Sequence, residues 1–195
     1  IEDGIEAGDT VRVTGRILPD GTLVAEEIVE VDDDDSAGCL NAAAIAAHPR
    51  LEGMVMGTND LARELGARFR ADRVPLMAGL GAAVLAARAE GRVILDGVYN
   101  AFRDEAGLRA ECEQGRDMGF DGKTLIHPAQ LDIANAVFAP SGAELELARR
   151  QIAAFAEART RGEGVAVVDG KIVENLHIVA AEAMLAKASL IAAMA

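Results

Sequence analysis

Residues 93–126 read VILDGVYNAFRDEAGLRAECEQGRDMGFDGKTLI, and their pattern decides the fold class. A short apolar run, residues 93–96, is followed by a helical pattern over residues 105–118 that stops at Gly119, and a further apolar run covers residues 124–126. A strand, a helix and another strand at this spacing are typical of a βα unit in a parallel sheet. The stretch therefore predicts an α/β fold.

The neighbouring segments continue the alternation of strands and helices. Upstream, the pattern predicts a helix over residues 41–48, a buried strand over 51–57, a helical turn from 61 to 65 and a helix over 75–90 capped by Gly91. Downstream, it predicts helices over residues 143–161 and 176–194 around a β-like segment, residues 164–173, with a turn at Asp169-Gly170. Three parallel strands do not close a barrel, so we expect this part to belong to a larger α/β architecture.

The first 35 residues follow a different pattern. Residues 10–16 and 22–31 alternate apolar and polar side chains around the turn Pro19-Asp20-Gly21, which predicts a β-hairpin. The acidic run Asp32–Asp35 is interpreted as a solvated linker, and a calcium-type oxygen cluster is the weaker alternative because no spaced ligands follow. We therefore expect three parts: residues 1–35, residues 36–142 with the parallel sheet, and a C-terminal helical part, residues 143–195.

The composition excludes several classes of protein. With 51% hydrophobic and 26% charged residues among 195, the chain builds a hydrophobic core. Its net charge of −13 argues against nucleic acid as a partner, because phosphate is repelled. The most apolar stretch, residues 178–195, is interrupted by Glu182 and Lys187, so we expect a packed helix and no membrane partner.

Two further features bear on the compartment. Cys39 and Cys112 lie far apart without a CxxC spacing, which indicates neither a disulfide framework nor a zinc site and favours the cytoplasm. The chain begins at Ile1 with no secretory leader pattern, and the missing methionine leads us to expect a fragment.

Reacting groups in parallel α/β folds gather at the carboxyl ends of the strands, so the residues after each predicted strand are the first candidates. After the first strand, Gly57-Thr58-Asn59-Asp60-Leu61 places a carboxylate at the expected opening. Asp60 either caps the following helix through backbone N–H groups or holds a hard cation, and the residues alone favour the cap.

Polar residues also follow the second and third strands. Asp96, Tyr99, Arg103 and Asp104 lie within nine residues, a density that suits a substrate opening, although Asp104 could equally cap the helix from Glu105. His127 follows the third strand and is either a substrate contact, a general base or a structural residue.

Common catalytic motifs are missing from the sequence. It holds no GxGxxG, P-loop, nucleophile elbow or HExxH pattern, so dinucleotide, nucleotide, serine-hydrolase and zinc-protease functions have no support. Lys123 precedes the third predicted strand and is expected at the end of the sheet away from the opening, which disfavours a Schiff-base lyase. A carbon–carbon lyase on this framework would use a divalent metal instead.

From about Ser36 to the C-terminus the chain resembles the citrate lyase β-subunit-like proteins of the HpcH/HpaI aldolase superfamily, which include malyl-CoA and citramalyl-CoA lyases. The resemblance covers about 160 of the 195 residues. The matching strings are Leu40-Asn41-Ala42, His48-Pro49-Arg50-Leu51-Glu52-Gly53, Gly57-Thr58-Asn59-Asp60-Leu61, Leu95-Asp96-Gly97-Val98-Tyr99, Phe102-Arg103-Asp104, Gly119-Phe120-Asp121-Gly122-Lys123, Ile126-His127-Pro128-Ala129-Gln130, Phe138-Ala139-Pro140-Ser141 and Val168-Asp169-Gly170-Lys171-Ile172.

The resemblance implies a partial TIM-type (β/α)8 barrel, made of the last three βα units and a C-terminal lid and preceded by the small hairpin. It implies Mg²⁺ bound by Asp60, with Asp34 nearest to the family's second metal ligand. Glu174, just after the Asp-Gly-Lys string, corresponds to a lid carboxylate that reaches a neighbouring subunit, so a homo-oligomer is expected. The family's arginine from an early strand has no counterpart here, and residues 1–35 match no part of the family.

The function expected from this resemblance is that of a Mg²⁺-dependent carbon–carbon lyase. Its substrate would be a β-hydroxyacyl-CoA such as malyl-, citramalyl- or citryl-CoA, and Mg²⁺ would lower the cost of the negative charge on the enolate. Asp96 and His127 are the candidate substrate contacts and Glu174 the candidate catalytic residue. The alternative is a non-catalytic partial barrel that acts as an interaction or regulatory partner.

Overall fold

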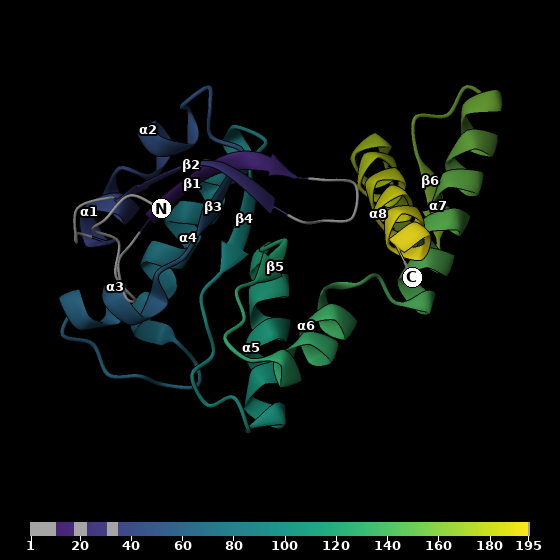
Figure 1. Ribbon diagram of the computed structural model, residues 1–195. Coiled ribbons are helices and arrows are strands. Elements are labelled where there is room, and N and C mark those ends of the chain that lie inside the picture. The colour runs from purple at the N-terminus through teal and green to yellow at the C-terminus, as the bar shows by residue number, and fades with distance from the viewer. Residues whose placement is uncertain (1–10, 18–22, 31–34, 195) are drawn as a thin grey trace. The chain divides into compact units, whose positions relative to one another are not determined.

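A computed structural model describes residues 11–17, 23–30 and 35–194 of the chain (Figure 1). The contacts divide the chain into two units, Ile1–Phe138 and Ala139–Ala195.

The N-terminal strands form the predicted hairpin. Strand β1, Val11–Ile17, pairs antiparallel with β2, Leu23–Glu30, with a shift of register between Thr14 and Gly15. The candidate metal ligand Asp34 lies outside the described residues. The assignment of residues 1–35 to a separate part that is unrelated to the lyase family stays a prediction.

The first unit contains a three-stranded parallel sheet. Its strands are β3, Gly53–Val55, β4, Val93–Asp96, and β5, Gly122–Lys123, in the order β3-β4-β5. Both pairs are parallel, which confirms that the three segments bring their carboxyl ends to the same edge. The helices of this unit are α1 Asp35–Leu40, α2 Ala42–Ala46, α3 Thr58–Glu64, η1 Val74–Leu76, α4 Met77–Ala89, α5 Glu105–Met118, η2 Pro128–Gln130 and α6 Leu131–Phe138.

The third strand was predicted at residues 124–126, and this position is wrong. Thr124 still donates its N–H to the Asp96 carbonyl at 2.9 Å, but the next backbone groups leave the sheet. The N–H groups of Ile126 and His127 donate to the side-chain oxygen of Gln130 instead, at 3.0 and 3.2 Å. The buried amide of Gln130 thus ends the strand at Lys123.

Two helical features differ from the expectation. Asp35 is not part of a linker, because it begins α1 and its N–H donates to Glu64 Oε1 at 2.9 Å. Helix α6 and the short turn η2 before it were not predicted. The available signal was the Pro128 that follows His127, since proline favours the first position of a helical turn.

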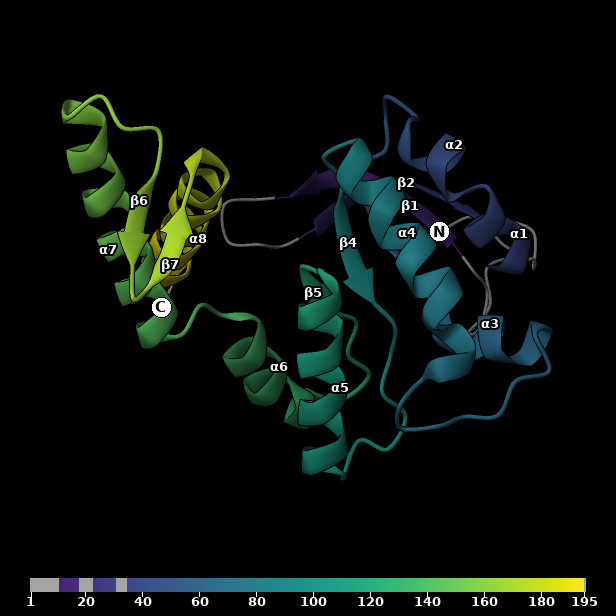
Figure 2. The ribbon, with the colours of Figure 1, turned by 180° about the vertical axis from the view of Figure 1, so that it is seen from behind.

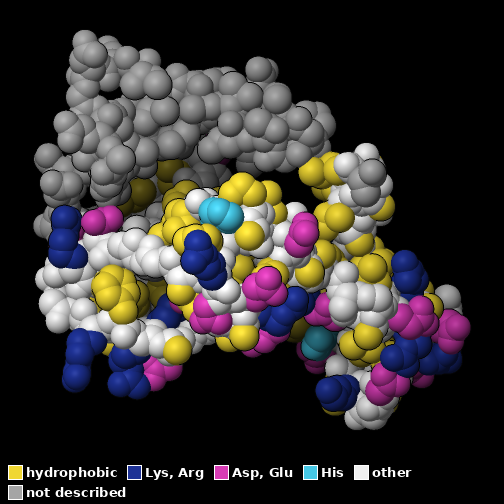
Figure 3. All heavy atoms as spheres, turned by 60° about the horizontal axis from the view of Figure 1, so that its bottom comes forward, with side chains coloured by type: hydrophobic (Ala, Val, Ile, Leu, Met, Phe, Trp, Pro, Cys, Tyr) yellow, Lys and Arg dark blue, Asp and Glu magenta, His cyan; other side chains and the backbone are white. Residues whose placement is uncertain are grey.

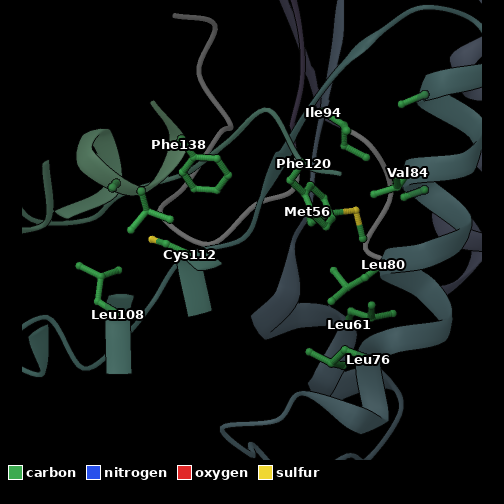
Figure 4. Close-up of a cluster of buried hydrophobic side chains, with 14 of the residues drawn as sticks. Met56, Leu61, Leu76, Leu80, Val84, Ile94, Leu108, Cys112, Phe120 and Phe138 are labelled. Carbon is green, nitrogen blue, oxygen red and sulfur yellow. The ribbon is translucent and has the colours of Figure 1, made fainter. Parts of the chain in front are cut away.

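The core of the first unit lies on one face of the sheet (Figure 4). Ile94 of β4 is fully buried with Leu80 of α4 and with Leu108 and Cys112 of α5, each at most 1% exposed. Successive side chains of a strand point to opposite faces. Val55 and Val93 lie on the opposite face and are 60% and 37% exposed, so that face is only partly covered by the described residues.

A buried cluster of charges closes the carboxyl end of the sheet on its helical side. Asp96 is fully buried and accepts hydrogen bonds from Arg73 Nη1, which lies 2.7 Å from each carboxylate oxygen. Lys123 Nζ donates to Asp96 Oδ2 at 3.2 Å and to Glu111 Oε1 at 2.6 Å. Two cations thus balance two carboxylates, which offsets the cost of removing four charges from water.

This cluster corrects two expectations about the sheet. Lys123 was expected at the end away from the opening, but it is the last residue of β5 and pairs in register with Asp96. Asp96 was expected to face a substrate opening, but its carboxylate points to α5, where an added Cβ on Gly115 would lie 2.8 Å from Oδ2. Both side chains are parts of the interior.

Helix α5 begins and ends where the sequence predicts. The Asp104 side chain accepts the N–H of Gly107 at 3.0 Å, and Gly119 ends the helix with a φ of 101°. Tyr99 donates its hydroxyl to the other oxygen of Asp104 at 2.8 Å. The N–H of Gly107 and then the Tyr99 hydroxyl lower the pKa of Asp104, whereas desolvation and then the bond to Asp104 raise the pKa of Tyr99 to about 12.

The second unit is two helices around a small hairpin. Helix α7, Gly142–Thr160, is followed by β6, Ala166–Val168, antiparallel to β7, Lys171–Val173, and then by α8, Asn175–Met194 (Figure 2). This order confirms the predicted segments. The turn places Asp169 and Gly170 at positive φ, and Arg150 of α7 forms two hydrogen bonds to the Asp169 carboxylate, at 2.7 and 2.8 Å.

Helix α8 is less packed than we expected. Ile178 and Ala181 are its buried residues among those described, and Ile178 belongs to the small core that contains Phe155 and Val173. By length and composition alone, α8 is long and apolar enough to cross a membrane. Single helices of this kind are weak evidence, because helices of globular proteins pass the same test.

We expect Gly115→Ala to destabilise the protein. The new Cβ would lie 2.8 Å from Asp96 Oδ2, so α5 has to move away from a carboxylate that both cations hold. Overpacking of this kind costs about 1–3 kcal/mol. Gly81→Ala in α4 is the matched control, because nothing lies within 4 Å of its added Cβ and it should gain up to about 1 kcal/mol. Urea unfolding followed by circular dichroism measures both, and equal effects would contradict the packing.

Tyr99 is the single tyrosine of a chain without tryptophan, so its ionisation is directly visible in the near-ultraviolet absorbance. The folded pKa lies near 12 and the ordinary value is 10, so this group stabilises the fold fully below pH 10, and the contribution is lost as the pH rises through 12. We expect a phenolate midpoint near 12 that Asp104→Asn lowers, whereas Asp132→Asn leaves it unchanged. A midpoint at 10 in protein that circular dichroism shows to be folded would contradict the hydrogen bond.

Candidate functional site

Three loops follow the three parallel strands at the carboxyl end of the sheet, residues 56–60, 97–104 and 124–130. Figure 3 brings forward the end of the molecule toward which β4 points in Figure 1, with both acidic and basic side chains on its surface. The candidate site of the first unit is built from these loops.

Asp60 stands in the first turn of α3, directly after β3. The N-cap of this helix is Gly57 and makes no side-chain cap, so the cap that we favoured for Asp60 is not what the structure shows. The Asp60 carboxylate is 31% exposed, and its recorded contact is Arg63 Nη2 at 3.5 Å, itself well exposed. An exposed pair of this kind is weak, so the carboxylate is available to a cation.

Two asparagines join the first loop to the second. Asn59 Nδ2 donates to Asn100 Oδ1 at 3.2 Å, and Asn100 Nδ2 donates to Asn59 Oδ1 at 2.7 Å. Each amide therefore satisfies the other. This reciprocal pair fixes the turn that carries Asp60 against the loop after β4.

Gln130 joins the second loop to the third. Its side chain is fully buried, accepts the N–H groups of Ile126 and His127, and donates to the Tyr99 carbonyl at 2.9 Å. His127 Nδ1 in turn accepts the N–H of Ala129 at 3.1 Å, which begins the turn η2. The three loops are thus held together by side-chain hydrogen bonds.

Aromatic and cationic groups cover this junction. The rings of Phe102 and His127 stack with centroids 4.5 Å apart and an angle of 28° between their planes. The guanidinium carbon of Arg103 lies 5.2 Å from the centroid of Phe102, within the range of a cation–π interaction. His127 therefore stays at the surface with its ring plane defined by its neighbours.

The other candidate residues lie elsewhere. Asp96 is enclosed in the charged cluster described above, so a contact with substrate stays a prediction that its burial does not support. Glu174 is exposed at the junction of β7 and α8 in the second unit, where its N–H donates to His177 Nδ1 at 3.0 Å. Glu174 thus belongs to the second unit and Asp60 to the first, and Asp34 lies outside the described residues.

Among the described residues, one side chain is a candidate ligand for Mg²⁺. No group of three or more His, Cys, Asp or Glu side chains in residues 35–194 is arranged to hold a metal. Asp60 nevertheless offers the type of donor that Mg²⁺ takes, since this ion is often bound by one or two carboxylates together with water and substrate oxygens. Asp60 therefore stays the single described candidate ligand.

Neither cysteine is prepared for nucleophilic catalysis. Cys39 and Cys112 are both free thiols, and burial is the main reason why the pKa of each is raised. A reactive cysteine needs a lowered pKa because the thiolate is the nucleophile.

Sequence reasoning missed the residues that hold the loops, which are Asn59, Asn100 and Gln130, and the cationic partner Arg73. The Asn59–Asn100 pair, the bond from Gln130 to the Tyr99 carbonyl and the bonds of Arg73 to Asp96 join positions that are far apart in the chain, so no local pattern reveals them. The local signal at Gln130 was its place three residues after His127, the spacing of a capping box.

The comparisons with known proteins all indicate the same family. The sequence model of the HpcH/HpaI aldolase/citrate lyase family matches residues 33–128. The chain is 76% identical over 160 residues to a (3S)-malyl-CoA thioesterase of Cereibacter sphaeroides, covering 82% of this chain and 56% of that protein. A second thioesterase from this species is 65% identical over 189 residues, covering 97% of this chain and 64% of that protein.

A more distant relative and a solved structure agree. An L-malyl-CoA/β-methylmalyl-CoA lyase of C. sphaeroides is 32% identical over 200 residues, covering 93% of this chain and 61% of that protein. The crystal structure of CitE from Mycobacterium tuberculosis with magnesium, acetoacetate and coenzyme A superposes with a TM-score of 0.66 at 34% identity. That superposition covers 79% of this chain and 58% of CitE.

The chain thus spans about 56–64% of the length of the curated relatives that it matches. The matched strings, the parallel sheet and the superposition on CitE agree with one another. The chain belongs to the HpcH/HpaI aldolase/citrate lyase family.

Proposed function

We propose that the chain is the C-terminal part of a Mg²⁺-dependent enzyme that acts on malyl-CoA or a similar β-hydroxyacyl-CoA, with a partial TIM-type barrel as its framework. The observation that carries the proposal is Asp60, a part-exposed carboxylate at the carboxyl end of β3 that is held by hydrogen-bonded loops. Identity of 76% to a malyl-CoA thioesterase supports the substrate class.

Within this proposal each candidate residue has a defined task. Asp60 binds Mg²⁺, which when bound supplies positive charge at the substrate oxygens, and Asp34 is the proposed second ligand. His127 contacts the substrate from the third loop. Glu174, in the second unit, is the proposed acid or base for the site of a neighbouring subunit. Asp96 takes a positioning task, because its ion pairs fix β4 and β5 beneath the loops.

The reaction that we favour is hydrolysis of the thioester, in place of the carbon–carbon cleavage that the family resemblance first suggested. The relatives at 65–76% identity bear the name thioesterase, and the relative named as a lyase is 32% identical. Hydrolysis adds water to malyl-CoA and gives malate and free coenzyme A. Cleavage by a lyase would give acetyl-CoA and glyoxylate, so the products separate the two reactions.

A non-catalytic partial barrel is the second candidate function. The exposed apolar residues Val55 and Val93 on the open face of the sheet favour it, because such a face suits a partner that completes the barrel. We also expect the 195-residue chain alone to be a poor catalyst. In a complete barrel further strands would face Asp60, and the described residues contain no such strands.

The test is a chimera that joins residues 35–195 to the N-terminal part of the C. sphaeroides thioesterase. We expect the chimera to release coenzyme A from (3S)-malyl-CoA in the presence of Mg²⁺ and the unmodified chain to stay near background. Asp60→Asn should lower the rate of the chimera about a hundredfold or more, because a lost charge-stabilising group commonly costs that much.

Asp132→Asn, which changes an exposed acid in the first turn of α6, is the matched control and should leave the rate unchanged. Free thiol reports hydrolysis, and chromatography detects acetyl-CoA. A chimera whose rate ignores Asp60→Asn would contradict the metal ligand, and acetyl-CoA with glyoxylate as the main products would identify a lyase. An inactive, folded chimera would favour the non-catalytic function.

We also propose a homo-oligomer in the cytoplasm. The free thiols of Cys39 and Cys112 suit a reducing compartment, and exposed apolar side chains on the sheet and along α8 suit a subunit contact. Light scattering coupled to size-exclusion chromatography should show a mass above the 20.3 kDa of one chain at micromolar concentration. A stable monomer that does not aggregate would refute the oligomer.

A further inference from the structure

The three histidines share a hydrogen bond that defines which ring nitrogen carries the proton in the neutral side chain. His48, His127 and His177 each accept a backbone N–H at Nδ1, from Arg50 at 3.3 Å, Ala129 at 3.1 Å and Glu174 at 3.0 Å. A ring nitrogen that accepts a hydrogen bond presents a lone pair, so the proton of the neutral imidazole lies on Nε2. All three side chains are therefore Nε2–H donors.

His127 is the one of the three that lies in the loops at the carboxyl end of the sheet. Its ring is stacked on Phe102, whose ring Arg103 also approaches. The backbone beneath it is fixed by the buried amide of Gln130, which also holds the Tyr99 carbonyl. The side chain is exposed, and Nε2 makes no recorded hydrogen bond within residues 35–194.

The same hydrogen bonds connect His127 to the turn that carries Asp60. Gln130 binds the loop after β4 at Tyr99, and Asn100 of that loop pairs with Asn59, the neighbour of Asp60 in the chain. An exposed donor with a defined tautomer and ring plane thus stands on the same connected set of loops as the candidate metal ligand.

We propose that His127 is a specificity residue that donates its Nε2–H to the free carboxylate of the β-hydroxyacyl-CoA, with Phe102 as a positioning residue that fixes the ring. The inference rests on the proposed function and refines it. It assigns His127 as a hydrogen-bond donor and excludes a general base at Nε2, because that nitrogen already carries the proton. A donor fixed before binding loses little freedom when the anion arrives.

The tautomer is tested first in the 195-residue chain. Two-dimensional ¹H–¹⁵N spectra of histidine-labelled protein should show an unprotonated Nδ1 and a protonated Nε2 for His127. Addition of (S)-malate with Mg²⁺ to the chimera should shift the His127 Nε2 signal and leave that of His48 in place. A protonated Nδ1, or a His127 signal that malate does not move, would overturn the inference.

Two substitutions at His127 separate its proposed role as a donor to the substrate from its role in capping η2. His127→Asn keeps an oxygen that accepts the Ala129 N–H, so the melting temperature should hold while KM for (3S)-malyl-CoA rises about tenfold or more, the usual effect of losing a hydrogen bond to a charged group. His127→Gln carries an amide donor with a longer reach and should recover part of the loss. His48→Asn removes an Nε2–H outside these loops and should change nothing.

The outcomes distinguish this inference from the proposed function. Turnover of malyl-CoA with the same KM in His127→Asn would refute the donor and leave the function standing. A chimera that does not turn over malyl-CoA but whose His127 signal responds to malate would refute the function and support the donor.

Discussion

The structure of the first unit depends on the hydrogen bonds and ion pairs that the buried carboxylate of Asp96 accepts. It is fully buried, and Arg73, Lys123 and the N–H of Gly97 all donate to it. These donors come from three segments: the connection before η1, the end of β5 and the loop after β4. Removing one partner of such a buried pair commonly costs about 3–5 kcal/mol, because an uncompensated charge is left behind. The cluster therefore joins the ends of β4 and β5 to the connection before η1.

Arg73 shows how strongly this cluster constrains the backbone. Its φ of 51° lies in the left-handed region, which side chains with a Cβ seldom adopt. Two hydrogen bonds to Asp96 and one from Nε to Gln114 at 2.6 Å hold the residue there. Strain of this kind persists where the surroundings over-determine it. Arg73 also ends a local turn, because its N–H donates to the Arg70 carbonyl at 3.1 Å, so the turn and the buried acid together hold it in place.

Much of the fold is predictable from the sequence because local signals were strong. Helix α5 has the limits that Asp104 and Gly119 predict, and Asp169-Gly170 forms the predicted turn between β6 and β7. The prediction was wrong where a polar side chain just outside the apolar run takes the backbone N–H groups that a strand would need. The run Thr124–Ile126 is apolar enough for a strand, yet the Gln130 amide takes the N–H of Ile126. Propensity describes an isolated segment, and a buried amide with three hydrogen bonds outweighs it.

For the candidate site, too, the sequence predicted the position of some residues and not of others. Asp60 and His127 were chosen as candidates because residues after parallel strands share one edge, and the metal role of Asp60 came from the family resemblance. Asp96 was chosen by the same rule as a candidate substrate contact, but the alternation of side chains along β4 turns it toward α5, on the face of Ile94, where it is fully buried. An acidic residue at the end of a strand can contact a ligand or lie in the interior, and the face of the sheet to which its side chain points decides between the two. The four residues of β4, Val93–Asp96, begin with three apolar residues in a row, so the sequence shows no alternation from which the face of Asp96 could be predicted.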